Sequence, residues 1–277
     1  MRNNKLSLSL TDSLILDVVL SSRRFHPRLG VRKLYHRYGD DIRNINKYFG
    51  RDKLFTLLRN NDLLVKRKKQ YHKTTNTNHF FRRYANKIKD IALTAPNQVW
   101  ASDITYLRVD KSKSNDNGHL YLSLLTDMYS RKIVGWSLSD NMSVDLCKSS
   151  LKQALKANKD YSNLFHHSDR GSQYCCYSYT DILDKHNVKI SMTEENHCYE
   201  NALAERVNGI LKDEYNLDRT FRNKQLAFIA CKEAIKLYNN DRPHWALGLK
   251  TPEQVHKNDI DKNEKSKYSI NNLKINL

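Results

Sequence analysis

The spacing of hydrophobic residues along this chain changes twice, and the first pattern, over residues 1–65, is helical. Apolar residues recur at positions 14, 15, 18 and 19, after Thr11 and Asp12, at the spacing of one helix face. The same spacing predicts helices at 30–38 and 52–60. Short basic helices in close succession are typical of a helix-turn-helix module. A plain helical bundle with solvated charges is a second interpretation of the same pattern.

The second region, residues 66–96, has few aliphatic residues and many polar and basic ones. Its central run, KRKKQYHKTTNTNHFFRRYANK, predicts an extended linker that lies along a polyanion such as nucleic acid. A solvated tether is the alternative interpretation. The candidate phosphate contacts in this linker are Lys66, Arg67, Lys68, Lys69, Arg82 and Arg83.

From residue 97 onward the pattern of hydrophobic and polar residues is that of a folded α/β domain, which we place at residues 97–258. β-Branched and aromatic runs predict strands at 99–109, 119–129, 133–139, 163–169 and 188–193. Helical spacing predicts helices that begin near Ser143, at 178–186, at 201–214 and at 223–240. Three antiparallel strands followed by alternating helix and strand make a mixed five-stranded sheet flanked by helices, the order of a ribonuclease-H-like fold.

The end of the chain has a short helix and then a polar tail. Thr251 is expected to cap this helix, with Pro252 at its first position. Residues 259–277 are rich in Asn and Lys, and we expect a flexible tail there.

The positive charge is concentrated in the first third of the sequence. The chain has a formal net charge of +18, of which residues 1–96 carry +15 and residues 97–277 carry +3. A basic segment beside a nearly neutral domain suggests that one part grips a polyanion while the other acts on it. A basic protein from a Lys- and Asn-rich proteome would have the same balance, so charge alone does not decide.

Cysteine usage and hydropathy exclude several other classes of protein. The five cysteines include no pair with two residues between, which argues against a zinc ribbon, and an odd count argues against a secreted disulfide scaffold. The N-terminal apolar run is interrupted by Asp12 and Asp17, unlike a signal peptide. No stretch is long and apolar enough to span a membrane, so we expect a cytoplasmic protein.

Three carboxylates are candidates for one catalytic site. Asp103 lies inside the first predicted strand, where an unpaired carboxylate is costly and requires a cation or a hydrogen-bond donor. Asp169 follows the fourth strand, and Glu205 lies within the helix at 201–214. An Asp followed 36 positions later by a Glu is expected by chance roughly 0.6 times in such a composition, so spacing alone proves little.

The helix that carries Glu205 is amphipathic. Its apolar stripe consists of Leu203, Val207, Ile210 and Leu211. The opposite face is predicted to hold Asn201, Glu205, Asn208 and Lys212. This arrangement would let a carboxylate face a metal ion while a lysine two turns further on reaches DNA.

Four motifs give these acids their context: WASDITYL, HSDRGSQY, CYENALAERVNGILKDE and YNNDRPHWALGLKTPEQ. Together they resemble the second reading-frame product of bacterial transposases of the insertion-sequence-three family, whose catalytic core resembles that of retroviral integrases. Sixty-five residues separate Asp103 from Asp169 and thirty-five separate Asp169 from Glu205, the second interval being usual in the family. The resemblance runs from about residue 30 to 254. His197 stands where such proteins often have glycine, which puts the flexibility of that loop in doubt.

The resemblance implies a DNA transposase. Asp103, Asp169 and Glu205 map onto the family's acids, which hold two Mg²⁺ ions for phosphoryl transfer, with Mn²⁺ expected to substitute. Lys212 maps onto the family's basic residue seven positions after the glutamate. The family cuts one strand at an element end and then joins the freed 3′-hydroxyl to another phosphodiester, commonly through a circular intermediate.

Other residues of the motifs have two interpretations each. Asn208, Gln173 and Arg242 are candidate DNA contacts, although Gln173 could serve the turn and Arg242 the packing of the closing motif. Asp127 could assist the metal ions, but pairing with Arg131 or capping of the turn is favoured. His166 and His167 precede Asp169 on a strand, so at most one can face the site, and a core role is favoured for both.

Two rival hypotheses remain open from sequence: a ribonuclease-H-type nuclease without strand transfer, and an inactive remnant or DNA-binding regulator. The basic N-terminal third argues against the first, and the presence of all three acids against the second. The expected partners are the terminal inverted repeats of the element, target DNA, further copies of the chain in a homo-oligomer, and an upstream-frame fusion partner. We expect the protein in the bacterial cytoplasm, on the nucleoid when it is bound to DNA.

Overall fold

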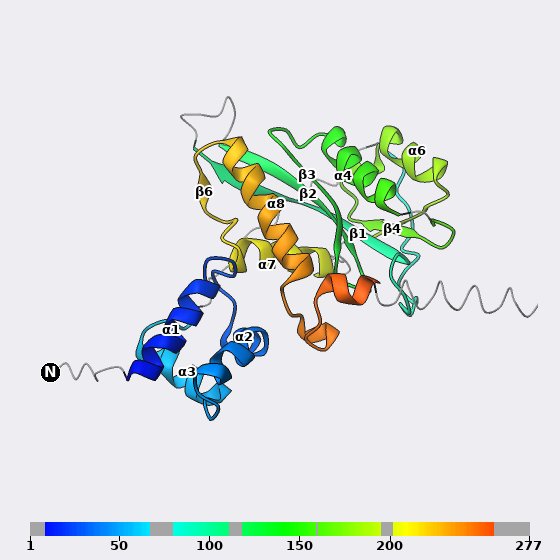
Figure 1. Cartoon of the computed structure of the whole chain (residues 1–277). Helices are drawn as coiled ribbons and strands as arrows, with labels where there is room; N and C mark the ends of the chain where they lie inside the picture. Colours follow the sequence, from blue (N-terminus) through cyan, green and yellow to red (C-terminus); the bar gives the residue numbers. More distant parts are fainter. Residues whose placement is uncertain (1–8, 67–79, 111–117, 159, 195–201, 258–277) are drawn as a thin grey trace, which may run out of the picture.

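The chain folds into a bundle of helices followed by a larger α/β unit (Figure 1). This computed structural model describes residues 9–66, 80–110, 118–158, 160–194 and 202–257. The expectations for Arg67, Lys68, Lys69, the loop at His197 and the tail at 259–277 lie outside the described residues. No helix in these ranges combines the length and the apolar character needed to cross a membrane.

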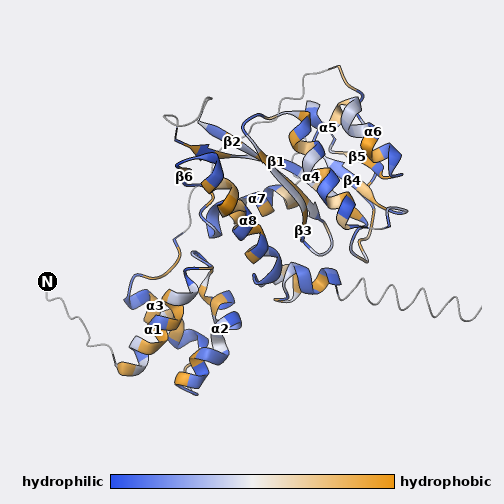
Figure 2. Cartoon of the chain, turned by 45° about the horizontal axis from the view of Figure 1, so that its top comes forward, coloured by the Kyte–Doolittle hydropathy of each residue, from blue (hydrophilic) through white to orange (hydrophobic). Residues whose placement is uncertain are grey.

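Three helices form the N-terminal bundle: α1 (Leu10–Ser22), α2 (Val31–Ile45) and α3 (Arg51–Asn60). Their apolar residues, whose ribbon is orange in Figure 2, form a separate core around Ile15, Leu34 and Leu54. The first helix begins earlier than expected, because the hydroxyl of Ser9 accepts a hydrogen bond from the Asp12 amide and caps it. The second runs well past residue 38, because Ile42 adds one more buried position to its apolar face.

Six strands form one mixed sheet in the order β3-β2-β1-β4-β5, with β6 paired to β1. The strands β1 (Val99–Val109), β2 (His119–Asp127) and β3 (Ile133–Ser139) are antiparallel. The strands β4 (Phe165–Ser168) and β5 (Lys189–Met192) lie parallel to β1. The expected five strands are confirmed, and the two-residue β6 (Thr220–Phe221), too short to give a sequence signal, is an addition.

Helices cover both faces of this sheet (Figure 1). One layer contains α4 (Val144–Ala157), α5 (Ser172–Cys175) and α6 (Tyr177–Lys185). The other layer contains α7 (Ala202–Glu214) and α8 (Lys224–Asn240), followed by the 3-10 turn η3 (Trp245–Leu247) and a helix at 252–257. Thr251 and Gln254 exchange backbone–side-chain hydrogen bonds of 3.2 and 2.9 Å at that last helix, which confirms the expected cap.

Strand β1 separates two hydrophobic cores, because successive side chains on a strand point to opposite faces. Trp100 and Ile104 belong to the core beneath α4, α5 and α6. Leu107 and Val109 belong to the core beneath α7 and α8. By the same alternation Asp103 is on the face that α7 covers.

Close approach of α4 to β3 depends on a glycine. A Cβ atom at Gly135 would lie 2.3 Å from the backbone oxygen of Ser150 and 3.0 Å from the Cβ of Ala154. Only glycine allows the helix to pack this closely on the strand. The ribonuclease-H-like fold class predicted from the sequence, with helices before it, is confirmed.

Candidate catalytic site

Strand register brings the first two carboxylates together. β1 and β4 pair in parallel with Val99 opposite Phe165 and Ala101 opposite His167. Continuing this register by two residues places Asp169 beside Asp103. Two acids 66 positions apart in the sequence therefore meet at the end of β4, where the parallel strands open toward α7.

Helix α7 contacts this pair through Asn208. The amide nitrogen Nδ2 of Asn208 donates a hydrogen bond of 2.6 Å to Oδ2 of Asp103, and the Asn208 side chain is buried. Asn208 therefore has a structural contact within the site, and its contact with DNA stays a prediction. Its face of α7 packs against β1, and its amide orients a carboxylate.

The three acids share one electrostatic environment. Burial and the neighbouring charges of Asp169 and Glu205 raise the pKa of Asp103 to about 7, although hydrogen bonds from the Ile104 backbone and Asn208 oppose the change. Mutual repulsion of carboxylates at a partly desolvated site has this effect on a pKa. The site thus concentrates more negative charge than its protein surroundings neutralise.

A tight turn holds Asp169. The backbone N–H of Gly171 donates to Oδ1 of Asp169 at 3.0 Å, and a Cβ atom on Gly171 would itself lie 3.0 Å from that oxygen. Glycine at this position leaves space for the carboxylate. The glycine of the HSDRGSQY motif therefore shapes the turn around the acid.

Glu205 is exposed in the first turn of α7. Its charge acts on Asp103, but no group of three His, Cys, Asp or Glu residues is close enough to hold a metal ion within the described ranges. The three acids are neighbours, but among the described residues they are not close enough together to hold one metal ion.

Lys212 follows on the same helix and turns toward β1. Its Nζ lies 4.3 Å from the centre of the Tyr106 ring, within cation–π range. Burial lowers the pKa of Lys212, while the charge of Asp103 raises it. The lysine thus lies beside the carboxylates, with part of its stem covered by an aromatic ring.

Two buried histidines, His166 and His167, precede Asp169 on β4. His166 accepts or donates a 2.8 Å hydrogen bond with the Tyr179 hydroxyl, and burial lowers the pKa of His166 to about 3. His167 bonds to the Ser191 hydroxyl at 3.0 Å. Both histidines are buried, so the core role favoured from the sequence is confirmed.

Asp127 has a structural position at the opposite end of the sheet. It is fully buried, and it accepts hydrogen bonds from the Asn97 amide at 2.7 Å and from the Ser130 amide and hydroxyl at 2.7 and 2.6 Å. These contacts cap the turn between β2 and β3, as favoured from the sequence.

The closing motif, residues 238–254, fastens α8 to its neighbours. The amide of Asn239 accepts from the Ile133 N–H and donates to the Ile133 carbonyl, both at 2.9 Å, as a neighbouring strand would. The hydroxyl of Tyr238 donates to the Arg131 carbonyl at 3.0 Å. The motif therefore pairs with the outer edge of β3.

Arg242 has structural contacts in this motif, which support the packing role favoured from the sequence, and its contact with DNA stays a prediction. Its side chain is 2% exposed and donates two hydrogen bonds, of 2.7 and 2.6 Å, to the Glu214 carboxylate at the end of α7. Such a bidentate pair occupies the guanidinium. Lys33 of α2 lies 3.4 Å from the same carboxylate.

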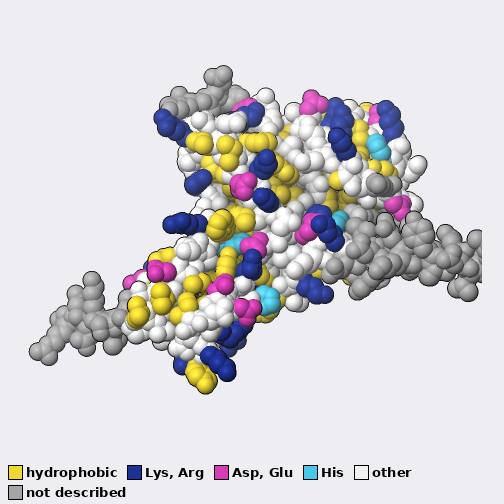
Figure 3. All heavy atoms as spheres, in the orientation of Figure 1, with side chains coloured by type: hydrophobic (Ala, Val, Ile, Leu, Met, Phe, Trp, Pro, Cys, Tyr) yellow, Lys and Arg dark blue, Asp and Glu magenta, His cyan; other side chains and the backbone are white. Residues whose placement is uncertain are grey.

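Asp241, the residue before Arg242, connects the closing motif to the N-terminal bundle. It accepts hydrogen bonds from His26 at 2.6 Å and from Arg37 at 2.7 Å. Figure 3 shows acidic and basic side chains close together where the N-terminal helices meet the core. No sequence signal identified these contacts, because their partners are about 200 residues apart.

The remaining candidate DNA contacts lie on the surface. Lys66, Arg82 and Arg83 are exposed, with the Arg82 guanidinium 5.1 Å from the Tyr84 ring centre. Gln173 lies in α5, and its amide donates to the Met142 carbonyl at 3.2 Å. This bond gives Gln173 a structural contact, and its contact with DNA stays a prediction.

Comparison with known families identifies the α/β unit. Residues 94–198 match the family described as "Integrase core domain", and residues 186–252 match a second family with the same description. The chain is 34% identical over 243 residues to the "Insertion element IS600 uncharacterized 31 kDa protein" of Shigella sonnei, covering 87% of this chain and 86% of that protein. It is 38% identical over 168 residues to "Transposase InsF for insertion sequence IS3A" of Escherichia coli (strain K12), covering 60% of this chain and 56% of that one.

Solved structures are similar at a lower level. The catalytic core domain of HTLV-2 integrase in complex with magnesium (trimeric form) is 20% identical, with a TM-score of 0.45, and the match covers 58% of this chain and 97% of that one. A chain of the simian T-cell lymphotropic virus intasome is 17% identical, with a TM-score of 0.49, covering 86% and 73%.

Proposed function

This chain belongs to the insertion-sequence-three family of bacterial transposases with an integrase catalytic core, and on that premise we propose that its three acids, Asp103, Asp169 and Glu205, carry out strand cleavage and strand transfer at element ends. The protein is a DNA transposase and hence a polynucleotidyl transferase. The observation that carries the proposal is the position of Asp103, Asp169 and Glu205 in one electrostatic environment between β1, β4 and α7.

The donor set of this site fits divalent magnesium. Hard cations prefer carboxylate oxygens, and Mg²⁺ is usually held by few carboxylates together with water and substrate phosphates. Burial and then the charge of Asp169 raise the pKa of Asp103, and a bound cation would offset both effects. Asp103, Asp169 and Glu205 would therefore hold two Mg²⁺ ions, and we expect Mn²⁺ to substitute.

Bound metal ions would supply charge neutralisation and activation of an oxygen nucleophile. The protein's own groups position the reaction. Asn208 holds one oxygen of Asp103, and the Gly171 amide holds one oxygen of Asp169, so both carboxylates keep fixed orientations. Lys212, beside them on α7, is placed to contact a DNA phosphate near the acids.

We further propose that separate regions of the chain have separate roles in DNA binding and catalysis. Residues 1–65 form a helix-turn-helix-like region that binds the terminal inverted repeats, residues 66–96 a basic linker, and residues 97–258 the catalytic core, followed by a tail. Lys66, Arg67, Lys68, Lys69, Arg82 and Arg83 would contact phosphates. A homo-oligomer would hold two element ends and target DNA together. An upstream-frame product would be its fusion partner in the bacterial cytoplasm.

The proposal is tested with labelled duplexes that carry an element end, incubated with the full chain and Mg²⁺. We expect both nicked strands and longer joined strands, and neither without the metal. Nicked strands without joined ones would favour a ribonuclease-H-type nuclease. Specific binding without either product would favour a DNA-binding remnant.

A further inference from the structure

An extended segment before β1 covers the open edge of the sheet. β5 is the edge strand, and residues 80–89 lie against it. The Met192 N–H donates to the Ala85 carbonyl at 3.4 Å, and the Lys87 N–H donates to the Ser191 hydroxyl at 2.9 Å. The segment thus provides hydrogen-bond partners for part of β5, an edge strand that would otherwise be free to pair with another chain.

Side chains of this segment are divided between an inner and an outer side. Phe81 and Tyr84 pack against the core beneath α4, α5 and α6. The exposed outer side is rich in cations: its members are Arg82, Arg83, Lys87 and Lys89. The inner aromatic rings therefore hold the outer cations in fixed places along the protein surface.

Exposed aromatic rings lie among these cations. Phe80 is fully exposed, and Tyr177 at the start of α6 is 64% exposed. The rings of Phe81 and Tyr177 meet edge to face at 6.1 Å, so Tyr177 stands next to the segment. Large exposed rings beside arginines are unusual on a protein surface and suit the stacking of nucleic acid bases.

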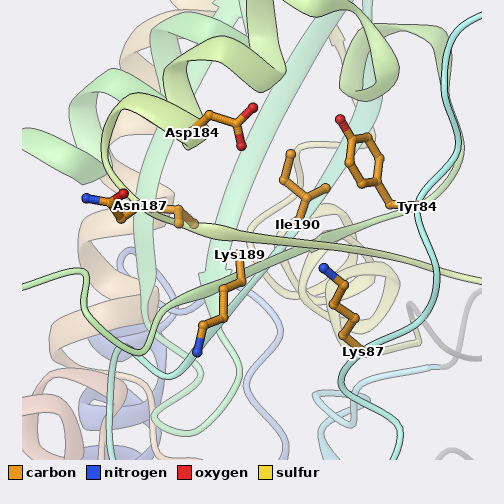
Figure 4. Close-up of a pocket in the computed structure, with 7 residues that line it drawn as sticks. Tyr84, Lys87, Asp184, Asn187, Lys189 and Ile190 are labelled. Carbon is orange, nitrogen blue, oxygen red and sulfur yellow. The ribbon is translucent and has the colours of Figure 1, made fainter.

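The far end of the segment forms a shallow pocket. Figure 4 shows Tyr84 and Lys87 from the segment, with Asp184 and Asn187 from the end of α6 and Lys189 from β5 around it. Lys189 lies with its Nζ 5.0 Å from the Phe165 ring centre and is exposed. Lys189 adds another cation beside those of the segment.

The near end of the segment lies on the same side of α5 as one catalytic acid, because Arg83 and Asp169 act on the same thiol. Burial and the charge of Asp169 raise the pKa of Cys175 in α5 to about 11, and the charges of Arg83 and Arg170 oppose this change. Arg83 and Asp169 therefore both lie within electrostatic range of one thiol.

We propose that residues 80–89, together with Tyr177 and Lys189, form an edge strip that binds unpaired nucleotides of the DNA substrate next to the catalytic acids. Bases within a duplex are stacked on one another, so only an unpaired base offers its face to Phe80 or Tyr177. The cations would contact the phosphates of the same strand. This inference rests on the proposed function, because it assigns a strand of the same substrate.

The test measures the affinity of the full-length protein for a labelled oligo-dT of about 12 nucleotides and for a blunt duplex over a range of salt concentrations. We expect Phe80→Ala and Tyr177→Ala each to weaken binding of the single strand by about tenfold, with little change for the duplex. Tyr177→Phe should retain binding. Phe228→Ala, which removes another exposed ring on α8 across the sheet, is the matched control and should have no effect.

The arginines have a separate expected result. Replacing Arg82 and Arg83 with alanine should lower the slope of log affinity against log salt by about 0.7 for each lost phosphate contact. Lys232→Ala on α8, across the sheet, should leave the slope unchanged. The stacking variants should leave this slope unchanged as well, because they remove no charge.

Equal affinities of wild type and Phe80→Ala for oligo-dT would overturn the edge strip, as would equal losses on single strand and duplex. Phe80 is fully exposed, so its variant does not depend on the folding of the core. Joining of precleaved ends is assayed in parallel. If Phe80→Ala binds oligo-dT like the wild type while the wild-type protein joins ends, this inference alone is contradicted. A wild-type protein that joins no ends contradicts the proposed function.

Discussion

Asp103 has an environment in which its ionised form is unfavourable without a cation. Burial and the charges of Asp169 and Glu205 raise its pKa to about 7, against an ordinary value of 3.8. A carboxyl group with a raised pKa in the folded state stabilises the fold while it is protonated. That contribution is complete below about pH 4 and is lost as the pH rises through 7.

Asp103→Asn should therefore stabilise the metal-free protein at pH 8 while it abolishes activity. The expected gain is roughly 2–4 kcal/mol in the free energy of unfolding, because the variant has no charge to bury. Urea denaturation with a chelator at pH 5 and pH 8 measures it. If the wild type and the variant lose the same stability between these pH values, the carboxylates do not repel one another as described.

Arg242 was ambiguous in the sequence, and the structure explains why. The motif around it predicted a functional residue, but nothing in the local pattern pointed to Glu214, 28 positions earlier. Burial with a bidentate partner is a tertiary property. Asn208 shows the same limit, because helical spacing gave its face relative to the apolar stripe but not the strand that covers that face.

Arg242→Met should destabilise the protein by about 3–5 kcal/mol, because it leaves the largely buried Glu214 carboxylate with Lys33 alone. Chemical denaturation measures the loss. Adding Glu214→Gln should restore part of it, since the uncompensated charge is then removed. Lys250→Ala, an exposed cation in the same motif, is the control. A wild-type stability for Arg242→Met would contradict the packing role of this arginine.

At the scale of elements, the sequence predicted most helices and strands because their side-chain periods were clear. The run at 133–139 was bounded correctly at both ends, since polar turns flank it. The missed elements had too few residues to show a period: α5 has four residues and β6 has two. The order of elements predicted a mixed sheet, but the register between its strands is a tertiary property that the sequence pattern does not give.

Packing of α4 on β3 gives a prediction at the same scale. Gly135→Ala would place a Cβ atom 2.3 Å from the Ser150 oxygen, a backbone atom that cannot move away without shifting the helix. We expect a loss of about 1–3 kcal/mol in the free energy of unfolding. Gly50→Ala, where the added atom meets nothing within 4 Å, should be nearly neutral. Equal stability of the two variants would contradict the close approach.

For the whole molecule, the contacts of Asp241 and Glu214 couple the N-terminal bundle to the catalytic core. Glu214 is the last residue of α7, the helix that carries Glu205 in its first turn. Glu214 also contacts Lys33 of α2. Burial raises the pKa of Asp241, but hydrogen bonds from His26 and Arg37 outweigh it and lower the pKa overall. The contribution of Asp241 is therefore present above its ordinary pKa and is lost as the pH falls through the lower, folded value.

Asp241→Ala should loosen the bundle from the core. We expect a loss of about 1–2 kcal/mol, because two hydrogen bonds to a partly exposed carboxylate disappear and His26 stays buried. Limited proteolysis should then release the bundle faster. Asp140→Ala, which breaks the exposed pair with Lys224, is the matched control and should change little. Unchanged proteolysis of Asp241→Ala would show that the bundle is held by other contacts.

The central claim is that Asp103, Asp169 and Glu205 act as one metal-binding unit, and strand transfer on a precleaved element end tests it most directly. Asp103→Asn, Asp169→Asn and Glu205→Gln should each reduce joined product by about 10³-fold or more in Mg²⁺ while DNA binding persists. Glu233→Gln, an exposed glutamate on α8, should join ends like the wild type. Wild-type joining by any one of the three acid variants would contradict the account.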